Sequence, residues 1–339
     1  MKKIYYITAV FATLFLVGCG DGIDLPGVNV ETDLNKIPLP DNNVNLEQVE
    51  LKPSTEPMLH EGLHTEEDFQ RIRDKKAAGE EPWVSAYQLL VESQFSQKTA
   101  DTYPTEWIKR GVSGDENYMN AARGATIAYQ QALRWKIEQD DEYAAKAVEN
   151  LNKWVQTCVG VTGNTNLSLA AGLYGYEFAI AGELLRDYGG WDRADFAAFQ
   201  NWLLKVFYPA NDDFLKRHHD TNALHYWANW CLCNIAAKMA IGIVTDRRDI
   251  YNEGIAHLQT GDTNGRLRRA IYHDYAPDYN FAQWQESGRD QGHTLMCVGL
   301  MGVICQLAWS QGDDFFAYDD NLFLRACEYA ACCNYTNET

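Results

Sequence analysis

Residues 227–239 read WANWCLCNIAAKM and carry an apolar side chain at every fourth position. Trp227, Cys231, Ile235 and Met239 are each about one turn apart in an α-helix, so all four lie on one face. The stretch therefore predicts a helix that packs through this face.

The same spacing recurs along most of the chain, and apolar–polar alternation long enough for a sheet is absent. Repeated helices joined by polar turns imply helical hairpins packed side by side. No short sequence period appears, so we predict an all-α, irregular toroid of hairpins rather than a regular solenoid. The other apolar stripes are Tyr143/Ala147/Leu151/Trp154, Tyr174/Phe178/Ala181/Leu185, Phe196/Phe199/Leu203/Val206 and the stretches 295–309 and 322–333.

The charge balance limits the partners of the protein. The 339 residues include 29 Lys+Arg and 47 Asp+Glu, which gives a net charge of −18. Phosphate backbones and anionic membrane surfaces repel such a chain, so we exclude nucleic acid as a partner. A polyanionic ligand would need basic residues gathered locally against this background.

The N-terminus carries an export signal. Lys2 and Lys3 precede an apolar run, residues 4–17, that is too short for a membrane-spanning helix, and LVGC follows at residues 16–19. This ending resembles the lipobox of bacterial lipoproteins, so we predict a signal peptide over 1–18 and a lipid on Cys19. The alternative is a plain secretory signal that happens to contain a cysteine. We expect an exported lipoprotein of the outer membrane, on its periplasmic face or at the cell surface, which touches the membrane only through its lipid.

Residues 19–57 differ in composition from the rest of the chain. They hold five of the nine prolines and show no periodicity, which is typical of an extended linker. We assign residues 58–339 to one helical domain and expect a monomer. The eight cysteines after Cys19 lie in apolar helical stretches, so we expect buried free thiols rather than disulfides. Cys231 and Cys233 lack the second pair that a zinc site needs.

Three polar clusters interrupt the apolar pattern. The first, residues 216–230, reads KRHHDTNALHYWANW and holds His218, His219 and His225, three of the eight histidines. It indicates either the amphipathic start of a helix or a polar binding face. If a helix begins near residue 221, one face presents Asn222, His225, Tyr226 and Asn229.

The second cluster, residues 266–275, reads RLRRAIYHDY. Its three arginines, Arg269 among them, form the local positive patch that a polyanion would need. If the segment is helical, Arg268, Tyr272 and Tyr275 share a face. A cation beside a phenol favours the phenolate, and lowering a tyrosine pKa from about 10 to about 8 requires roughly 2.7 kcal/mol.

The third cluster, residues 285–293, reads QESGRDQGH. Glu286, Arg289, Asp290 and His293 are spaced so that their polar groups converge on one side of a turn or helix start. They form either a buried ion-pair network that braces a loop or part of a binding site, and the two roles are compatible.

These clusters resemble segments of the alginate lyase superfamily. So do HEGLH at residues 60–64, the expected helix from Thr65 to Gly79, and GEEPW at residues 79–83. The resemblance runs from about residue 58 to the end of the chain and is nearest to polysaccharide lyase families 5 and 38. It implies that residues 58–339 form a catalytic domain with the fold of an incomplete (α/α) toroid. Because the chain ends at Thr339, inside or just after a helical segment, the presence of the last helices of a full toroid stays open.

One departure from the family affects the catalytic base. The family's Asn-Asn-His-x-Tyr-Trp block aligns with residues 222–227, and the position of the catalytic histidine holds Leu224. A neighbouring residue on a helix points about 100° elsewhere. Either His218, His219 or His225 supplies the imidazole from a shifted backbone, or Tyr275 works without it.

The resemblance implies β-elimination on a polyuronate, with alginate as the leading candidate. A lyase must neutralise the carboxylate, remove the C5 proton and protonate the 4-oxygen. On the family pattern Asn222, with His225 or Arg289, binds the carboxylate, and Tyr275 beside Arg268 donates to the leaving oxygen. No metal or cofactor is required, and we interpret His60 and His64 as structural. The remaining predicted substrate-binding residues are His293, Glu286, Tyr226, Trp227, Tyr272, Gln285 and Arg269.

Two other functions fit parts of the sequence. A non-catalytic glycan-binding lipoprotein would need stacking aromatic rings but no Tyr–Arg pair. A toroidal glycoside hydrolase would need two carboxylates, which Asp220, Glu286 and Asp290 could provide.

Overall fold

The computed structural model describes residues 54–276 and 278–335; the predicted signal peptide, Cys19 and the linker up to residue 53 lie outside the described residues. Within them the chain is mostly helical. The helices are α2 (Glu66–Ala77), α3 (Trp83–Glu92), α4 (Tyr118–Glu138), α5 (Asp141–Thr157), α6 (Leu167–Leu184), α7 (Arg193–Val206), α8 (Tyr208–Arg217), α9 (Ala228–Val244), α10 (Arg248–Thr260), α11 (Leu267–Ala270), α12 (Gln291–Ser310) and α13 (Tyr318–Tyr335), with 3-10 turns η2 (Gln94–Ser96) and η3 (His218–Asp220).

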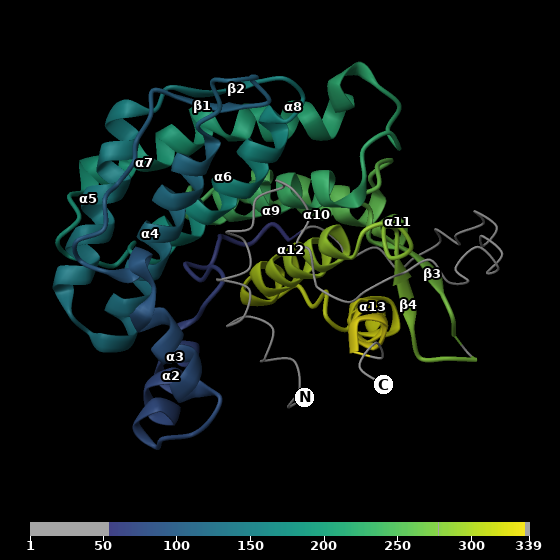
Figure 1. Ribbon diagram of the computed structural model, residues 1–339, viewed down its shortest axis with the longest axis horizontal. Coiled ribbons are helices and arrows are strands. Elements are labelled where there is room, and N and C mark those ends of the chain that lie inside the picture. Colours follow the sequence, from purple (N-terminus) through teal and green to yellow (C-terminus); the bar gives the residue numbers. More distant parts are fainter. Residues whose placement is uncertain (1–53, 277, 336–339) are drawn as a thin grey trace.

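Four long helices, α4, α6, α9 and α12, form an inner layer in which each packs against the next. Other helices cover this layer from outside: α5 packs on α4, α7 and α8 on α6, α10 on α9 and α13 on α12. Figure 1 shows this succession, with the α2–α3 hairpin beside α4. The predicted all-α fold, an incomplete toroid of helical hairpins, is confirmed.

The helices form where the apolar spacing predicts them. Phe196, Phe199, Leu203 and Val206 of α7 are all buried, as the stripe requires. Aspartates cap the starts of α5, α7 and α12 by accepting a backbone N–H. At Gly172, α6 approaches α9 so closely that a Cβ would lie 2.5 Å from a sulfur of α9, so this contact requires glycine.

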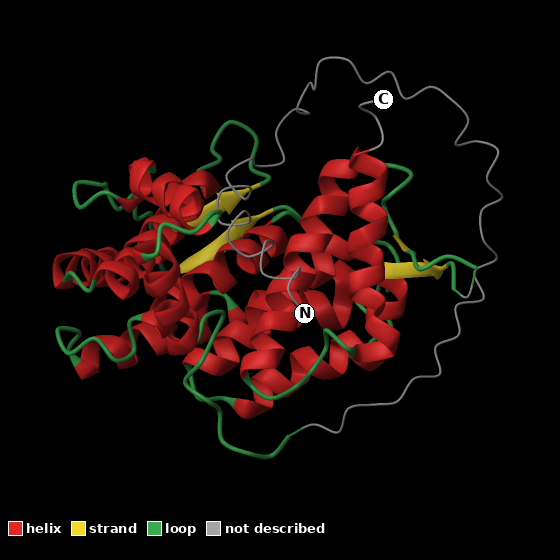
Figure 2. Ribbon diagram, turned by 90° about the horizontal axis from the view of Figure 1, so that it is seen from below, coloured by secondary structure: helices red, strands yellow, loops and turns green. Residues whose placement is uncertain are grey.

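Two short sheets were not expected from the sequence. Strands β1 (Trp107–Arg110) and β2 (Gly160–Gly163) pair in parallel, and β3 (Ile271–Asp274) and β4 (Ala282–Trp284) pair antiparallel. Figure 2 shows the two pairs as separate strands at different sides of the helices. Each strand has three or four residues, too few for apolar–polar alternation to be recognised in sequence.

The segment before α2, residues 54–64, crosses the ends at which the inner helices finish, and we call it the N-terminal strap. The Leu59 N–H donates to Gln311 just after α12 (2.9 Å), and His60 pairs with Asp246 just after α9 (3.0 Å). His64 hydrogen-bonds the Tyr129 hydroxyl of α4 at 2.5 Å. Both histidines therefore join the strap to the helices, as a structural role predicts.

The cysteines are free thiols, as predicted for the described residues. Five are buried, two are half-buried, and Cys332 is exposed, contrary to the expectation of burial. Helix α12 has the length and apolar composition of a membrane-spanning helix. It is largely buried between α9 and α13, which is the position of a core helix.

We predict that the protein loses stability as the pH falls from about 6.5 to about 4.5. Burial lowers the pKa of His64, His218 and His257 from 6.5 to about 4, so each stays neutral in the fold but takes up a proton on unfolding. Each contributes stability above pH 6.5 that declines by about 1.4 kcal/mol per pH unit below it. Burial also raises the pKa of Glu177, to about 8, and the pKa of Glu183, and these two groups act in the opposite direction, so three groups act against two.

Urea unfolding at pH 7.5, 6.5, 5.5 and 4.5 measures this loss. His257→Gln removes one of these three groups and should reduce the slope. A free energy of unfolding that stays constant or rises between pH 6.5 and 4.5 would contradict the prediction.

Candidate active site

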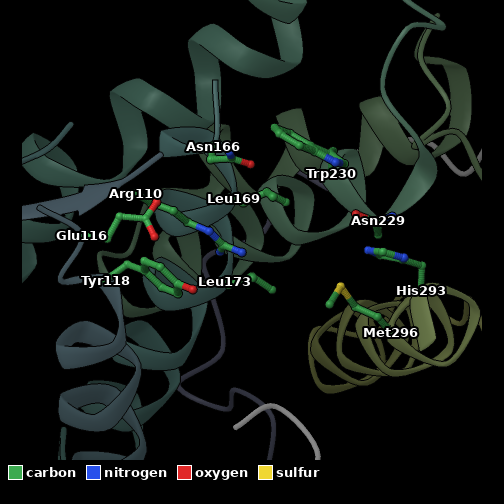
Figure 3. Close-up of a pocket in the computed structure, with 10 residues that line it drawn as sticks. All are labelled: Arg110, Glu116, Tyr118, Asn166, Leu169, Leu173, Asn229, Trp230, His293 and Met296. Atoms are coloured by element: carbon green, nitrogen blue, oxygen red, sulfur yellow. The ribbon is translucent and has the colours of Figure 1, made fainter. Parts of the chain in front are cut away.

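A pocket of about 230 Å³ lies where the four inner helices begin. Figure 3 shows Arg110 and Tyr118 on one wall, Asn229, His293 and Met296 on the opposite wall, and Leu169 and Leu173 between them. Glu116, Asn166 and Trp230 complete the lining.

The backbone gives this pocket a positive potential. The first residues of α4, α6, α9 and α12 all contribute to its lining, so four helix N-termini gather around one space. A helix N-terminus carries a partial positive charge and backbone N–H groups without intrahelical partners. The arrangement favours an anion in the pocket, even though the whole chain carries a net charge of −18.

Arg110 reinforces this potential. It is the last residue of β1, it is 5% exposed, and it lines the pocket. Its guanidinium lies over the Tyr118 ring, 4.7 Å from the centroid, and Tyr118 in turn stacks on Tyr174 of α6. A cation therefore lies beside a phenol in this pocket, but the two residues are Arg110 and Tyr118, not the pair predicted from the sequence.

The opposite wall carries a histidine held by a carboxylate. His293 Nδ1 donates to Asp290 Oδ2 (2.6 Å), and its backbone N–H donates to Asp290 Oδ1 (3.0 Å). Burial acts to raise the pKa of Asp290, but these bonds outweigh it and the pKa lies below its usual value. The Asp290 carboxylate fixes the ring orientation, and Figure 3 shows His293 and Arg110 pointing toward each other across the pocket.

The first and third polar clusters meet at this wall. The Ala228 N–H donates to Gln285 Oε1 (3.0 Å), and Asn229 Nδ2 donates to the buried Glu286 carboxylate (2.6 Å). Glu286 also pairs with Arg289, whose guanidinium lies 4.5 Å from the centre of the Trp227 ring. The predicted ion-pair network thus exists, and it joins the start of α9 to the segment before α12.

Comparison with protein families identifies the fold and the class of enzyme. Residues 72–337 match the alginate lyase family model, which is more than half of the chain. The chain belongs to the alginate lyase family. It is therefore a polysaccharide lyase with the toroid fold.

Solved structures in this family share the fold. Alginate lyase A1-III from Sphingomonas species A1 superposes with a TM-score of 0.57 at 13% identity over 83% of this chain and 80% of that one. A variant of that enzyme with tyrosine replaced by phenylalanine, in complex with a tetrasaccharide, gives a TM-score of 0.57 at 14% identity over 83% and 80%. A second variant complex, with histidine replaced by alanine, gives 0.57 at 13% over 83% and 79%. No curated protein matched the sequence.

In this alginate lyase family member the start of α9 differs from the prediction. The helix begins at Ala228, not near residue 221, so Asn222, His225, Tyr226 and Asn229 do not share a helical face. Two local features stop the helix: residues 218–220 adopt positive φ angles, and the Asn222 side chain accepts the N–H of Leu224 (2.8 Å).

The three predicted histidines of this segment lie outside the pocket lining. His218 is buried against Cys231, and burial lowers its pKa to about 4. His219 hydrogen-bonds Ser168 of α6 (2.9 Å), next to the pocket residue Leu169. His225 is exposed and lies edge-on to the buried Tyr226 ring. Of the histidines that the sequence proposed for the site, His293 lines the pocket.

The second cluster also differs from the prediction. Helix α11 ends at Ala270, and pairing with β4 extends the following residues into β3, so Arg268, Tyr272 and Tyr275 do not share a helical face. Arg268 pairs with Asp274 (3.2 Å) and with Asp319. The Tyr275 hydroxyl donates to Gln283 (2.7 Å) and its ring stacks on Tyr329 of α13. The expected contact of Arg268 with Tyr275 is therefore wrong.

Arg269, the third residue predicted for the positive patch, does not line the pocket, and its guanidinium donates to the Asp262 carbonyl (2.6 Å). The positive patch read from the sequence is thus largely committed to local partners. Arg110, Tyr118 and Asn166 were missed because they stand in non-helical or helix-starting segments without a chemical motif. Only the pairing of β1 with β2 brings Arg110 to the inner end of the toroid. Within residues 54–276 and 278–335, no group of three or more His, Cys, Asp or Glu side chains is arranged to hold a metal ion.

Proposed function

We propose that this enzyme cleaves a polyuronate by β-elimination, with alginate as the first candidate substrate, and that it is nearest to polysaccharide lyase families 5 and 38. One observation carries the proposal: a buried guanidinium and four helix N-termini surround one pocket in a strongly acidic protein. A uronate is a sugar with a carboxylate, and such a pocket stabilises that charge.

The reaction requires three groups around the uronate ring. A base takes the C5 proton, the electrons of that bond form the C4–C5 double bond, and the bond from C4 to the leaving oxygen breaks. An acid then protonates the leaving oxygen. After the reaction the base releases its proton to solvent and the acid takes one up, so the number of protons on the enzyme is restored. Negative charge builds on the carboxylate meanwhile, and positive groups lower the barrier.

We assign proton removal to His293. The ring lines the pocket, and Asp290 holds Nδ1 at 2.6 Å, which is the arrangement of a histidine base with its orienting carboxylate. His293 can serve in place of the histidine that Leu224 replaces. Leu224 itself is half exposed and does not line the pocket.

We assign the proton donor to the β3–β4 hairpin, which carries Tyr272 and Tyr275. The resemblance implies Tyr275, and that role stays a prediction. Two observations support Tyr272. In the hairpin, Ile271 at the start of β3 pairs with Trp284, and the next residue, Gln285, accepts the N–H of Ala228 at the start of α9. Tyr272 therefore lies nearer than Tyr275 to this contact between the hairpin and α9. The Tyr275 hydroxyl is bonded to Gln283, and no hydrogen bond to a described residue engages Tyr272.

The carboxylates proposed for a hydrolase have other partners. Glu286 is buried between Asn229 and Arg289, and Asp290 caps α12 while holding His293. Asp220 is exposed and pairs with Arg217. These contacts favour a bracing role for the acidic residues over paired acid and nucleophile.

We further propose that Cys19 carries the lipid and that the enzyme acts as an exported monomer at the outer membrane. The basic start, the apolar run and the LVGC ending support this location. A polymer too large to cross a membrane suits an enzyme held outside the cytoplasm.

We expect ultraviolet absorbance to rise when the purified protein meets its polymer, because elimination leaves a double bond conjugated with the carboxylate. The panel is mannuronate-rich alginate, guluronate-rich alginate and glucuronan, with a neutral glucan as control. New reducing ends without absorbance would indicate hydrolysis instead. Binding with neither signal would indicate a glycan-binding protein.

We expect Tyr272→Phe to lower turnover by about 10²–10⁴-fold, because it removes the acid that protonates the leaving oxygen. Tyr275→Phe is the matched variant on the same hairpin and should lower turnover less than about tenfold. Initial rates at saturating polymer, with circular dichroism to verify folding, measure both. The reverse order would return the role to Tyr275.

We expect full-length protein to partition into the detergent phase of a Triton X-114 extract and Cys19→Ser to move to the aqueous phase. The thiol at residue 19 is the attachment point for the acyl chains, and serine cannot form the thioether. Incorporation of a labelled fatty acid measures the lipid directly. A wild-type protein without label would contradict lipidation but not export.

A further inference from the structure

Arg110 is a buried cation without a counter-ion. The residue is 5% exposed, its Nη1 atom has no hydrogen-bond partner, and no residue of the described chain forms an ion pair with it. Leaving a charge buried and uncompensated is strongly unfavourable, so a folded protein normally pairs it. The other buried arginines near helix ends follow that rule: Arg186 holds Glu183 and Arg325 holds Asp274.

The acidic residue of the same pocket does not pair with this guanidinium. Glu116 lines the pocket, but its Oε1 accepts the N–H of Gly111 at 2.5 Å. The loop that carries it is held by its own bonds, since Lys109 pairs with Asp115 (2.6 Å) and Asn117 closes onto the Lys109 backbone. The Glu116 carboxylate therefore helps to shape the loop and forms no ion pair with Arg110.

The position of Arg110 is fixed from both sides. Its backbone is paired with Gly163 of β2, where a Cβ would lie 1.7 Å from the Arg110 carbonyl oxygen, so the two strands meet at a distance only glycine permits. The Tyr118 ring lies under the guanidinium and keeps its plane directed into the pocket. A planar, oriented guanidinium is suited to a carboxylate, with which it forms two parallel hydrogen bonds.

We propose that Arg110 binds the carboxylate of the uronate residue whose C5 proton is removed, and so makes the free carboxylate a condition for binding. This inference rests on the proposed function and deepens it. The amide expected to do this work, Asn222, is exposed, caps its own turn and does not line the pocket. Arg110 faces His293 across the pocket, so a carboxylate held by Arg110 places the adjacent C5–H between the two walls (Figure 3).

A consequence for substrate class follows. A methyl-esterified or carboxyl-reduced polyuronate has no charge to offer Arg110 and leaves it buried and unpaired, so it is rejected. The pocket therefore selects uronic acids over their esters and over neutral hexoses of the same shape.

The test measures binding and folding separately from cleavage. Titration calorimetry on the full chain uses D-mannuronate and D-glucuronate, which contain no glycosidic bond to cleave, with mannose and glucose as neutral counterparts. We expect Arg110→Met to weaken uronate binding by about 100-fold or more and to unfold at the same or a higher temperature than the wild type. Arg123→Met, another arginine of this region that lies over Tyr103 and outside the pocket lining, is the matched control and should bind as the wild type does.

Added guanidinium ion should partly restore polymer cleavage to Arg110→Met, an effect that a merely structural role would not produce. Unchanged uronate binding by Arg110→Met, or a loss of folding that accounts for the loss of binding, would overturn the inference. A wild type that binds the uronates but cleaves no polymer would refute the proposed function and leave the role of Arg110 standing. Cleavage by Arg110→Met at the wild-type rate would refute the role of Arg110 and leave the proposed function standing.

Discussion

The four inner helices begin at the same end of the toroid, and the rest of the site depends on this shared direction. Each helix brings its partial positive charge to that end, and the sum does not depend on any single side chain. Neighbouring helices that alternated in direction would cancel these charges. The connections impose the arrangement, because the segments between successive inner helices return the chain to the end where the next inner helix starts.

The two walls of the pocket, one with Arg110 and Tyr118 and the other with Asn229 and His293, must also be held at a fixed separation. On one side, the short pairing of β1 with β2 sets Arg110, and the start of α4 sets Tyr118. On the other side, Asn229 and Glu286, separated by 57 residues in the chain, form a buried hydrogen bond. A buried amide bonded to a carboxylate is costly to break, since each group would lose its partner away from water. The network of the third cluster therefore keeps His293 in place, although Glu286 itself is sealed from the pocket.

The sequence predicted those parts that depend on local spacing. The stripe in 227–239 lies in α9, and the four-residue and three-residue intervals of α7 became a buried face. Capping aspartates and Thr65 at the start of α2 could be recognised in the same way. Residues 227–229 and 285–289 were predicted as parts of two separate polar clusters. Their contact was not predicted, because the sequence does not indicate which clusters meet in the fold.

The errors have physical causes of the same kind. A left-handed turn at residues 218–220 and an asparagine turn delayed α9, and β-pairing pulled Tyr272 and Tyr275 out of the helix that holds Arg268. Arg110 could not be predicted as a site residue from the sequence, because it is marked by its burial and by its lack of an ion-pair partner, which are properties of the folded chain. The pairing of β1 with β2 places Arg110 at the pocket, and the sequence around Arg110 does not reveal this pairing.

The N-terminal strap has a consequence for how the enzyme meets its polymer. It contacts the far ends of α9 and α12, the ends opposite the pocket. The described chain therefore starts at the back of the ring, where the Ser54 carbonyl accepts a hydrogen bond from Asn252 of α10 (2.8 Å). None of the strap residues lines the pocket, so a long glycan can cross the pocket end of the ring without meeting the strap.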